Sequence, residues 1–146
     1  MNSKQRVRLR FRTAVLERDG YRCVMCGHPG KDRQGGEGHK GFHKTTVENE
    51  LVPLDAHHIT DRHSMPLGGY VPENGITLCD DGCHRLAEVF HQTGEAVPGY
   101  GPNDLYQRIG SSAVLAHRAS EALASAPRQI YAAMNKAMRD GDGVWR

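Results

Sequence analysis

Four cysteines in two close pairs constrain the fold more than any other feature of the sequence. Two residues separate Cys23 from Cys26, and three separate Cys79 from Cys83. Such pairs, joined by a long intervening segment, are typical of a tetrahedral zinc site in which each sulfur lies about 2.3 Å from the metal. One disulfide within each pair and four free thiols are the alternatives. Zinc is the expectation for a cytoplasmic chain, because reducing conditions disfavour disulfides.

A zinc ion bound by these four cysteines would be structural. All four ligands are protein groups, so the metal would have no open position for catalysis. The site would tie the segment around Cys23 to the segment around Cys79, which is more than fifty residues away. Because small metal domains often unfold without their ion, we expect zinc to contribute to the folding free energy.

The centre of the chain has the pattern strand, loop, strand, helix. Apolar residues in VENELVPLDAHHIT (47–60) predict a strand, and Pro and Gly predict a loop over residues 61–73. A second strand is expected at GITLC (75–79), followed by a helix in DDGCHRLAEVFHQTG (80–94) that stops at Gly94. RFRTAVLERDGYRC (10–23) predicts a short helix ended by Gly20, and residues 27–46 a polar, glycine-rich loop.

Helical patterns continue after residue 103, with the last predicted helix following Pro127 and stopping at Gly141. We therefore expect an α+β protein. Residues 1–100 would form a zinc-stabilised core that begins with a basic helix. Residues 101–146 would form a helical extension that packs on or beside this core.

The charge is unevenly distributed along the chain. The net charge is +2, but residues 1–22 carry seven basic and two acidic side chains, which leaves +5 there and −3 elsewhere. A basic arm on a near-neutral body favours a polyanionic partner, above all DNA or RNA. We expect Arg8, Arg10 and Arg12 to contact nucleic acid; the alternative is a solvated helix face.

The sequence has no run of 18 apolar residues and no apolar stretch of the kind that secretion signals need near residue 1. A cytoplasmic location is therefore the expectation.

Three histidines and an asparagine are predicted to converge. His57 and His58 end the first strand, Asn74 precedes the second, and His84 begins the helix directly after Cys83. If zinc holds that helix start near the paired strands, these side chains share one small volume. A neutral imidazole can accept a proton from water near pH 7, and an amide can fix its tautomer.

Adjacent residues on a regular strand point to opposite faces, which conflicts with a site shared by His57 and His58. Either the pleat breaks at the strand end or the site wraps around the strand edge. The loop that begins at Thr60 favours a break over residues 56–59. If the side chains of His57 and His58 leave opposite faces of an ideal strand, this would contradict the prediction that they have two different roles in one site.

The ordered combination DAHHI…GGY…ENGITLC…CH, over about residues 20–92, resembles the zinc-stapled HNH endonucleases of phages and bacteria. The resemblance implies a ββα-metal (His-Me finger) fold and metal-dependent hydrolysis of DNA phosphodiester bonds. It implies a general base at His58, metal ligands at His57 and His84, and at Asn74 a residue that orients the base. One divalent cation is implied, Mg²⁺, Mn²⁺, Ni²⁺ or Zn²⁺. The three-residue spacing of the second cysteine pair and the long glycine-rich insertion depart from the usual pattern.

Four further residues are weaker candidates. Glu88 lies one helical turn after His84 and is either a third metal ligand or a solvent-facing residue. Arg62 could hold a phosphate or be a solvated loop residue. We expect Asp61 to cap the loop and His91 to lie at the surface.

Two other functions remain open at this stage. The chain could be a catalytically silent zinc module that binds nucleic acid through its basic arm. It could also dock a phage or bacterial protein through its helical extension. A homodimer is a further possibility, because a one-site nuclease usually needs two copies to cut both DNA strands.

Overall fold

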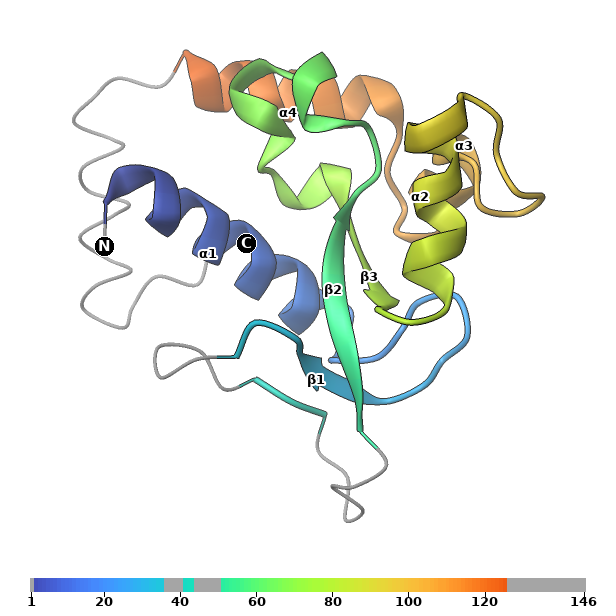
Figure 1. Cartoon of the computed structure of the whole chain (residues 1–146). Coiled ribbons are helices and arrows are strands. Elements are labelled where there is room, and N and C mark those ends of the chain that lie inside the picture. The colour runs from blue at the N-terminus through green and yellow to red at the C-terminus, as the bar shows by residue number, and fades with distance from the viewer. Residues whose placement is uncertain (1, 36–40, 44–50, 126–146) are drawn as a thin grey trace.

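A small three-stranded sheet lies at the centre of the protein. The computed structural model describes residues 2–35, 41–43 and 51–125. The sheet has the order β1 (Gly30–Asp32), β2 (Val52–His58) and β3 (Gly75–Cys79), with helices around it (Figure 1). β1 runs parallel to β2, and β2 runs antiparallel to β3. The predicted α+β class is confirmed, with β1 as a strand that the sequence did not predict.

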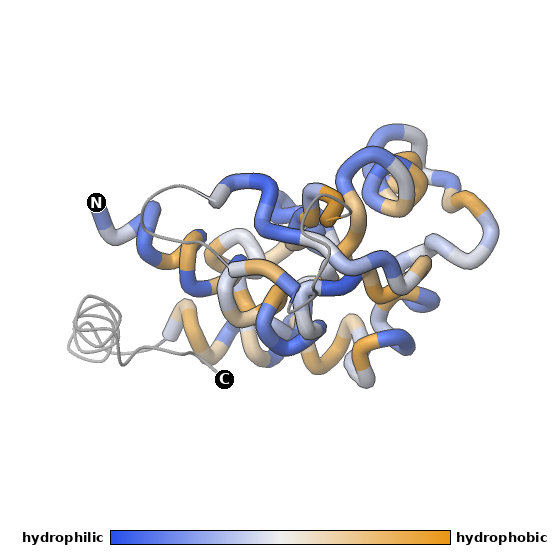
Figure 2. Tube along the Cα trace, turned by 90° about the horizontal axis from the view of Figure 1, so that it is seen from below, coloured by the Kyte–Doolittle hydropathy of each residue, from blue (hydrophilic) through white to orange (hydrophobic). Residues whose placement is uncertain are grey.

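The N-terminal helix α1 (Ser3–Arg18) is longer than predicted. It begins at a capping box in which the side chains of Asn2 and Gln5 each accept a hydrogen bond from the other residue's backbone N–H. Figure 2 shows hydrophobic and hydrophilic residues alternating along this helix. The chain turns at Gly20, as predicted, with a positive φ of 69°.

The loop between β2 and β3 contains three short 3₁₀ helices: η2 (Arg62–Ser64), η3 (Pro66–Gly69) and η4 (Pro72–Asn74). β3 has the predicted bounds. The helix α2 (Cys83–Thr93) follows it and ends at Gly94, where φ is +80°. The predicted order of strand, loop, strand and helix is therefore confirmed.

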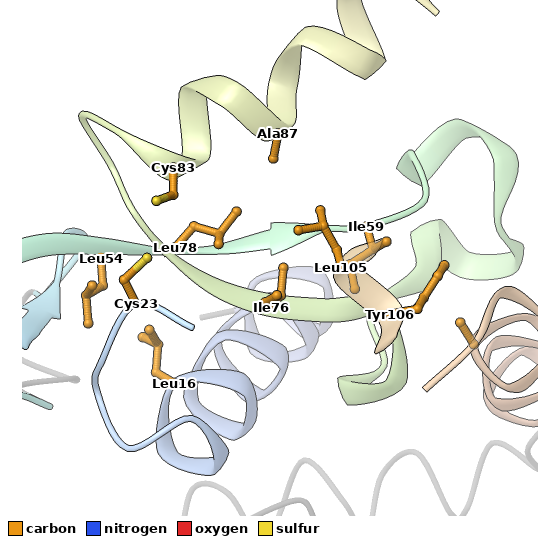
Figure 3. Close-up of a cluster of buried hydrophobic side chains, with 11 residues drawn as sticks. Leu16, Cys23, Leu54, Ile59, Ile76, Leu78, Cys83, Ala87, Leu105 and Tyr106 are labelled. Carbon is orange, nitrogen blue, oxygen red and sulfur yellow. The ribbon is translucent and has the colours of Figure 1, made fainter. Parts of the chain in front are cut away.

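Two of the predicted tail helices are present, α3 (Pro102–Arg108) and α4 (Ala113–Ala124). The helix predicted after Pro127 lies outside the described residues. α3 belongs to the same hydrophobic core as the strands, because Leu105 and Tyr106 are buried beside Ile59, Ile76 and Leu78 (Figure 3).

The helices α1 and α2 cover opposite faces of the β2–β3 pair (Figure 1). On one face, α1 approaches β3 so closely that a Cβ on Gly75 would lie 2.4 Å from Val15 Cγ2. This position therefore needs glycine. On the other face, Ala87 of α2 packs in the core with Leu78. No helix among the described residues has both the length and the apolar composition to cross a membrane.

Candidate functional site

The four cysteines form one cluster that can hold a metal ion. Their sulfur atoms all lie within 4.8 Å of one another, and no disulfide joins them. Cys26 Sγ lies 3.8 Å from Cys79 Sγ, which is about the separation of two sulfurs in a tetrahedron with zinc–sulfur bonds of about 2.3 Å. The four thiols are free in this structure, which agrees with a shared metal site better than with one disulfide within each pair. Burial raises the pKa of the Cys83 thiol to about 12, so a cation is needed to make it a thiolate.

A second cluster lies between the end of β2 and the first turns of α2. His57 Nδ1 lies 3.2 Å from Glu88 Oε1, and His84 Nε2 lies 3.3 Å from the same oxygen. The ring centroids of His57 and His84 are 5.2 Å apart. The three side chains offer ligand atoms that lie within 4.8 Å of one another. The structure thus brings together the three residues predicted to bind the catalytic cation.

The protonation of this cluster suits a cation. Burial lowers the pKa of His57, so its imidazole is neutral near pH 7. The hydrogen bond from His57, together with the nearby imidazoles, lowers the pKa of Glu88 to about 2 despite partial burial. A neutral imidazole and an ionised carboxylate are the forms that bind metal, so binding requires little further rearrangement of charge.

The predicted break of the pleat over residues 56–59 is wrong. β2 keeps regular pairing with β3 through His57, opposite Ile76, and His58, opposite Gly75. The two side chains therefore leave opposite faces of the sheet. His57 contacts α2 through Glu88, whereas the His58 ring stacks on Phe11 of α1 with centroids 4.4 Å apart.

Both histidines nevertheless line the same cleft, because no strand among the described residues pairs with the end of β2 on its β1 side. β1 ends at Asp32, which pairs with Leu54, so β1 does not extend along the rest of β2. A cleft of about 480 Å³ follows this edge and is lined by side chains from both faces of the strand, including His57 and His58. The opposite faces are the outcome that counts against two roles in one site. A site that wraps around the strand edge is the alternative that remains for placing both histidines in one cleft.

The imidazole of His58 is held by two aromatic rings. Phe11 stacks on it, and Tyr70 meets it edge-on with centroids 4.6 Å apart. Its Nε2 atom is buried and has no hydrogen-bond partner among the described residues. Burial lowers the pKa of His58 to about 3, so the ring is neutral and can accept a proton but is a weak base. A buried polar atom without a partner is expected to find one in water or a ligand.

The hydrogen bonds of the Asn74 side chain go to Thr60, Gly69 and Tyr106 and not to the His58 imidazole, contrary to the prediction that it fixes the tautomer of that ring. Its Oδ1 accepts hydrogen bonds from Thr60 N (2.9 Å) and Tyr106 Oη (2.7 Å). Its Nδ2 donates to the carbonyl oxygens of Thr60 (3.1 Å) and Gly69 (3.2 Å). Asn74 is completely buried and closes the β2–β3 loop. Its carbonyl oxygen also accepts a hydrogen bond from the N–H of Ile59, the residue after His58, at 2.9 Å.

Carboxylates also face the other nitrogen of His84. Its Nδ1 lies 3.4 Å from Asp55 Oδ2 and 3.6 Å from Asp80 Oδ1. Arg33 bridges the same two carboxylates at 3.2 Å and 3.6 Å. A carboxylate at the ring nitrogen opposite the metal is a common means of orienting a metal-binding histidine. The sequence did not predict this network, because Arg33 lies in the glycine-rich loop and Asp55, although it begins the DAHHI stretch, had no predicted role.

The predicted nucleic-acid-binding arginines differ in their availability. Arg8 and Arg62 are exposed and line the cleft, and Arg62 donates a hydrogen bond to Tyr70 Oη at 3.2 Å. Arg12 also lines the cleft, but it pairs with Asp32 at 2.9 Å. The prediction for Arg10 is wrong, because its side chain lies on the buried face of α1 and the residue is only 5% exposed.

Two remaining candidates are also placed by the structure. His91 is not the surface residue that the sequence predicted: it is half-buried, and its Nε2–H donates to the carbonyl oxygen of His58 at 2.9 Å. This bond fastens α2 to the end of β2. Asp61 caps η2 as predicted, since its Oδ1 accepts a hydrogen bond from His63 N at 2.8 Å.

No protein-family model, curated protein or solved structure matches the chain.

Proposed function

We propose that the protein is a metal-dependent endonuclease that hydrolyses DNA phosphodiester bonds with one cation and one histidine base, in the manner of HNH enzymes. A single observation carries the proposal. The cluster of His57, His84 and Glu88 opens into the same cleft as His58, and exposed arginines line that cleft. A module that only binds nucleic acid has no need of such a cluster beside its basic residues.

His57, His84 and Glu88 would hold the cation. Two imidazoles and one carboxylate suit Mn²⁺, Ni²⁺ or Zn²⁺ slightly better than Mg²⁺, which prefers oxygen ligands. When bound, the cation would offset negative charge on the phosphoryl oxygens and on the leaving oxygen. Asp55 and Asp80 would support it by keeping the Nδ1–H of His84 directed towards themselves, which leaves Nε2 free to act as the ligand.

His58 would accept the proton of the attacking water. Its Nε2 has no partner among the described residues, and the rings of Phe11 and Tyr70 fix its plane. Arg8 and Arg62 line the same cleft and supply positive charge for the substrate phosphates. Arg62 forms a planar fork that suits phosphate oxygens, and its bond to Tyr70 keeps it beside His58.

One observation favours a second function, a catalytically silent zinc module that binds nucleic acid. The pKa of His58 is lowered to about 3, whereas an efficient general base has a pKa close to the working pH. Proton transfer from water to this ring is therefore more costly than transfer to an ordinary histidine. Cleavage assays separate the two functions.

The test is cleavage of supercoiled plasmid by the purified full chain in Mg²⁺, Mn²⁺, Ni²⁺ or Zn²⁺. Nicked or linear product is expected, and His58→Ala should lower the rate at least about a hundredfold, the usual contribution of a general base. His117→Ala is the matched control, since this exposed histidine lies on α4 and pairs with Glu121. Full activity in His58→Ala, or no cleavage with any metal, would contradict the proposal.

A further inference from the structure

A second groove borders the candidate catalytic cleft. It has a volume of about 730 Å³ and lies between the first turns of α1, the η2–η3 segment and the last turn of α4. Its lining combines two kinds of side chain. Lys4, Arg8 and Arg62 are exposed and cationic, whereas Val7, Leu67 and the ring of Tyr70 are apolar. The described lining residues include no carboxylate.

Tyr70 forms the wall between the groove and the cleft, because it lines both. Its ring meets His58 edge-on, and the guanidinium carbon of Arg8 lies 5.9 Å from its centroid. Arg8 and Arg62 also line both cavities. A polyanionic chain held by these two arginines would therefore continue from the groove into the cleft beside His58.

Leu67 is presented to this groove by a strained backbone. It has φ +50° and ψ 30°, a left-handed conformation that leucine rarely adopts, and it is 50% exposed. The turn does not depend on leucine at this position. The next residue, Gly68, is also left-handed, and Asn74 fixes the following carbonyl, that of Gly69. A large apolar side chain held outward at a strained position indicates a contact with something beyond the described residues.

We propose that this groove binds unpaired nucleotides that flank the bond to be cut, with phosphates at the cationic rim and base faces against Leu67, Val7 and Tyr70. The inference rests on the proposed nuclease function for the nature of its ligand. It adds a substrate class: DNA that is single-stranded or locally unpaired beside the scissile phosphate.

The apolar floor of the groove, formed by Val7, Leu67 and the ring of Tyr70, is the feature that indicates unpaired DNA. In a duplex, the faces of the bases are hidden in the stack, and only phosphates, sugars and base edges face outward. Those groups would leave an apolar floor without a partner. Unpaired bases expose faces that stack on aromatic and apolar side chains, while cationic residues follow the backbone. The volume of the groove lies within the range of about 300–1,000 Å³ that small-ligand sites span.

The test compares binding of a fluorescein-labelled oligothymidylate and of a hairpin duplex to the full chain, by fluorescence anisotropy without added divalent metal. The key variant is Leu67→Asn, because asparagine tolerates left-handed backbone and should preserve the turn. Affinity for oligothymidylate should fall about tenfold, the order of one base contact, and affinity for the hairpin should change little. Leu115→Asn, at a leucine of similar exposure on α4, is the control and should change neither.

The cationic rim has its own readout. Lys4→Gln should reduce the slope of log affinity against log salt for oligothymidylate by about 0.7, the value for one phosphate contact on a single strand. Lys31→Gln, on β1 outside the groove, should leave the slope unchanged. Equal salt slopes in the two variants would contradict the proposal that the phosphates of the oligothymidylate lie at the cationic rim of the groove.

The remaining outcomes separate this inference from the nuclease proposal. Unchanged oligothymidylate affinity in Leu67→Asn overturns the inference, even where plasmid cleavage persists. The inference is equally overturned if that variant alters only the self-association of the chain in sedimentation. Selective loss of oligothymidylate binding supports it, and absence of cleavage by the same preparation would then count against the nuclease alone.

Discussion

Asp55 Oδ2 lies 3.4 Å from Nδ1 of His84, whereas the Nε2 atom of the same ring lies 3.3 Å from Glu88. The imidazole thus has one nitrogen for a supporting carboxylate and the other for the candidate cation site. Asp55 comes from β2 and His84 from α2, so this contact also fixes the helix start against the strand.

Removal of the Asp55 charge should weaken the cation site without removing its ligands. Asp55→Asn is expected to lower Mn²⁺ affinity about tenfold or more, because an amide orients the imidazole less strongly than a carboxylate does. Calorimetric titration with Mn²⁺ measures the change. Asp81→Asn, an exposed acid on the same turn as Asp80, is the control and should bind Mn²⁺ normally. Equal affinities in the two variants would exclude a supporting role for Asp55.

Asn74 is expected to act mainly on stability. Asn74→Ala removes the partner of the Thr60 N–H and of the carbonyl oxygens of Thr60 and Gly69, while the Tyr106 hydroxyl keeps its contact with Thr60 Oγ1 at 2.7 Å. It should lower the free energy of unfolding by about 3 kcal/mol or more. Tyr106→Phe removes the hydroxyl alone and should cost about 1 kcal/mol. Urea denaturation compares both with the exposed control Asn103→Ala, for which a change below about 0.5 kcal/mol is expected. A loss in Asn74→Ala no greater than in the control would show that the loop does not depend on this amide.

The cysteine cluster should contain about one zinc ion per chain, because four thiolates complete a tetrahedral shell. Metal analysis after mild chelation should still find the zinc, whereas Cys23→Ser should lose it and melt at a lower temperature. His28→Ala changes the histidine that follows the first cysteine pair and should keep the zinc. Full zinc in Cys23→Ser, or loss of zinc in His28→Ala, would mean that the ligand set is different.

The tight turn before Tyr70 should depend on glycine. A Cβ on Gly69 would lie 2.6 Å from Asn74 Nδ2, and its φ is +65°. Gly69→Ala therefore combines backbone strain with a steric clash and should cost more than the roughly 1 kcal/mol of strain alone. Gly94→Ala isolates that strain, since φ there is +80° and no atom lies within 4 Å of the added carbon. Equal unfolding free energies for the two variants would show that the loop shifts to accommodate the methyl group.

The sequence predicted those parts of the fold that local patterns specify. Residues 75–79 form a short, mainly apolar segment that turn-forming residues precede and follow, so the observed bounds of β3 agree with the prediction. Gly94 follows a helix with a clear apolar period, so the end of α2 also agrees. The start of α1 was missed because its first residues are polar and basic and have no apolar period. β1 was missed because three residues form no pattern, and its pairing with β2 depends on tertiary contacts.

The sequence predicted several residues of the candidate site, but not their hydrogen-bond partners or their burial. The sequence predicted that His57 and His84 would meet and left open whether Glu88 joins them, and the structure places all three together. Spacing could not show which partner the Asn74 amide would choose, because backbone groups compete with side chains for it. Nor could it show that the face of α1 containing Arg10 is buried, since the hydrophobic stripe of that helix is weak.

β1 ends after three residues, and its short length leaves the end of β2 accessible from that side. A β1 two residues longer would pair with Asp55 and Ala56 and would cover the edge where the two faces of β2 meet one cleft. The length of β1 therefore limits the size of a ligand that can contact His57 and His58 at the same time. Lengthening this strand would restrict access to the cleft and would also move Arg33 and Gln34, the two residues after β1, which line it.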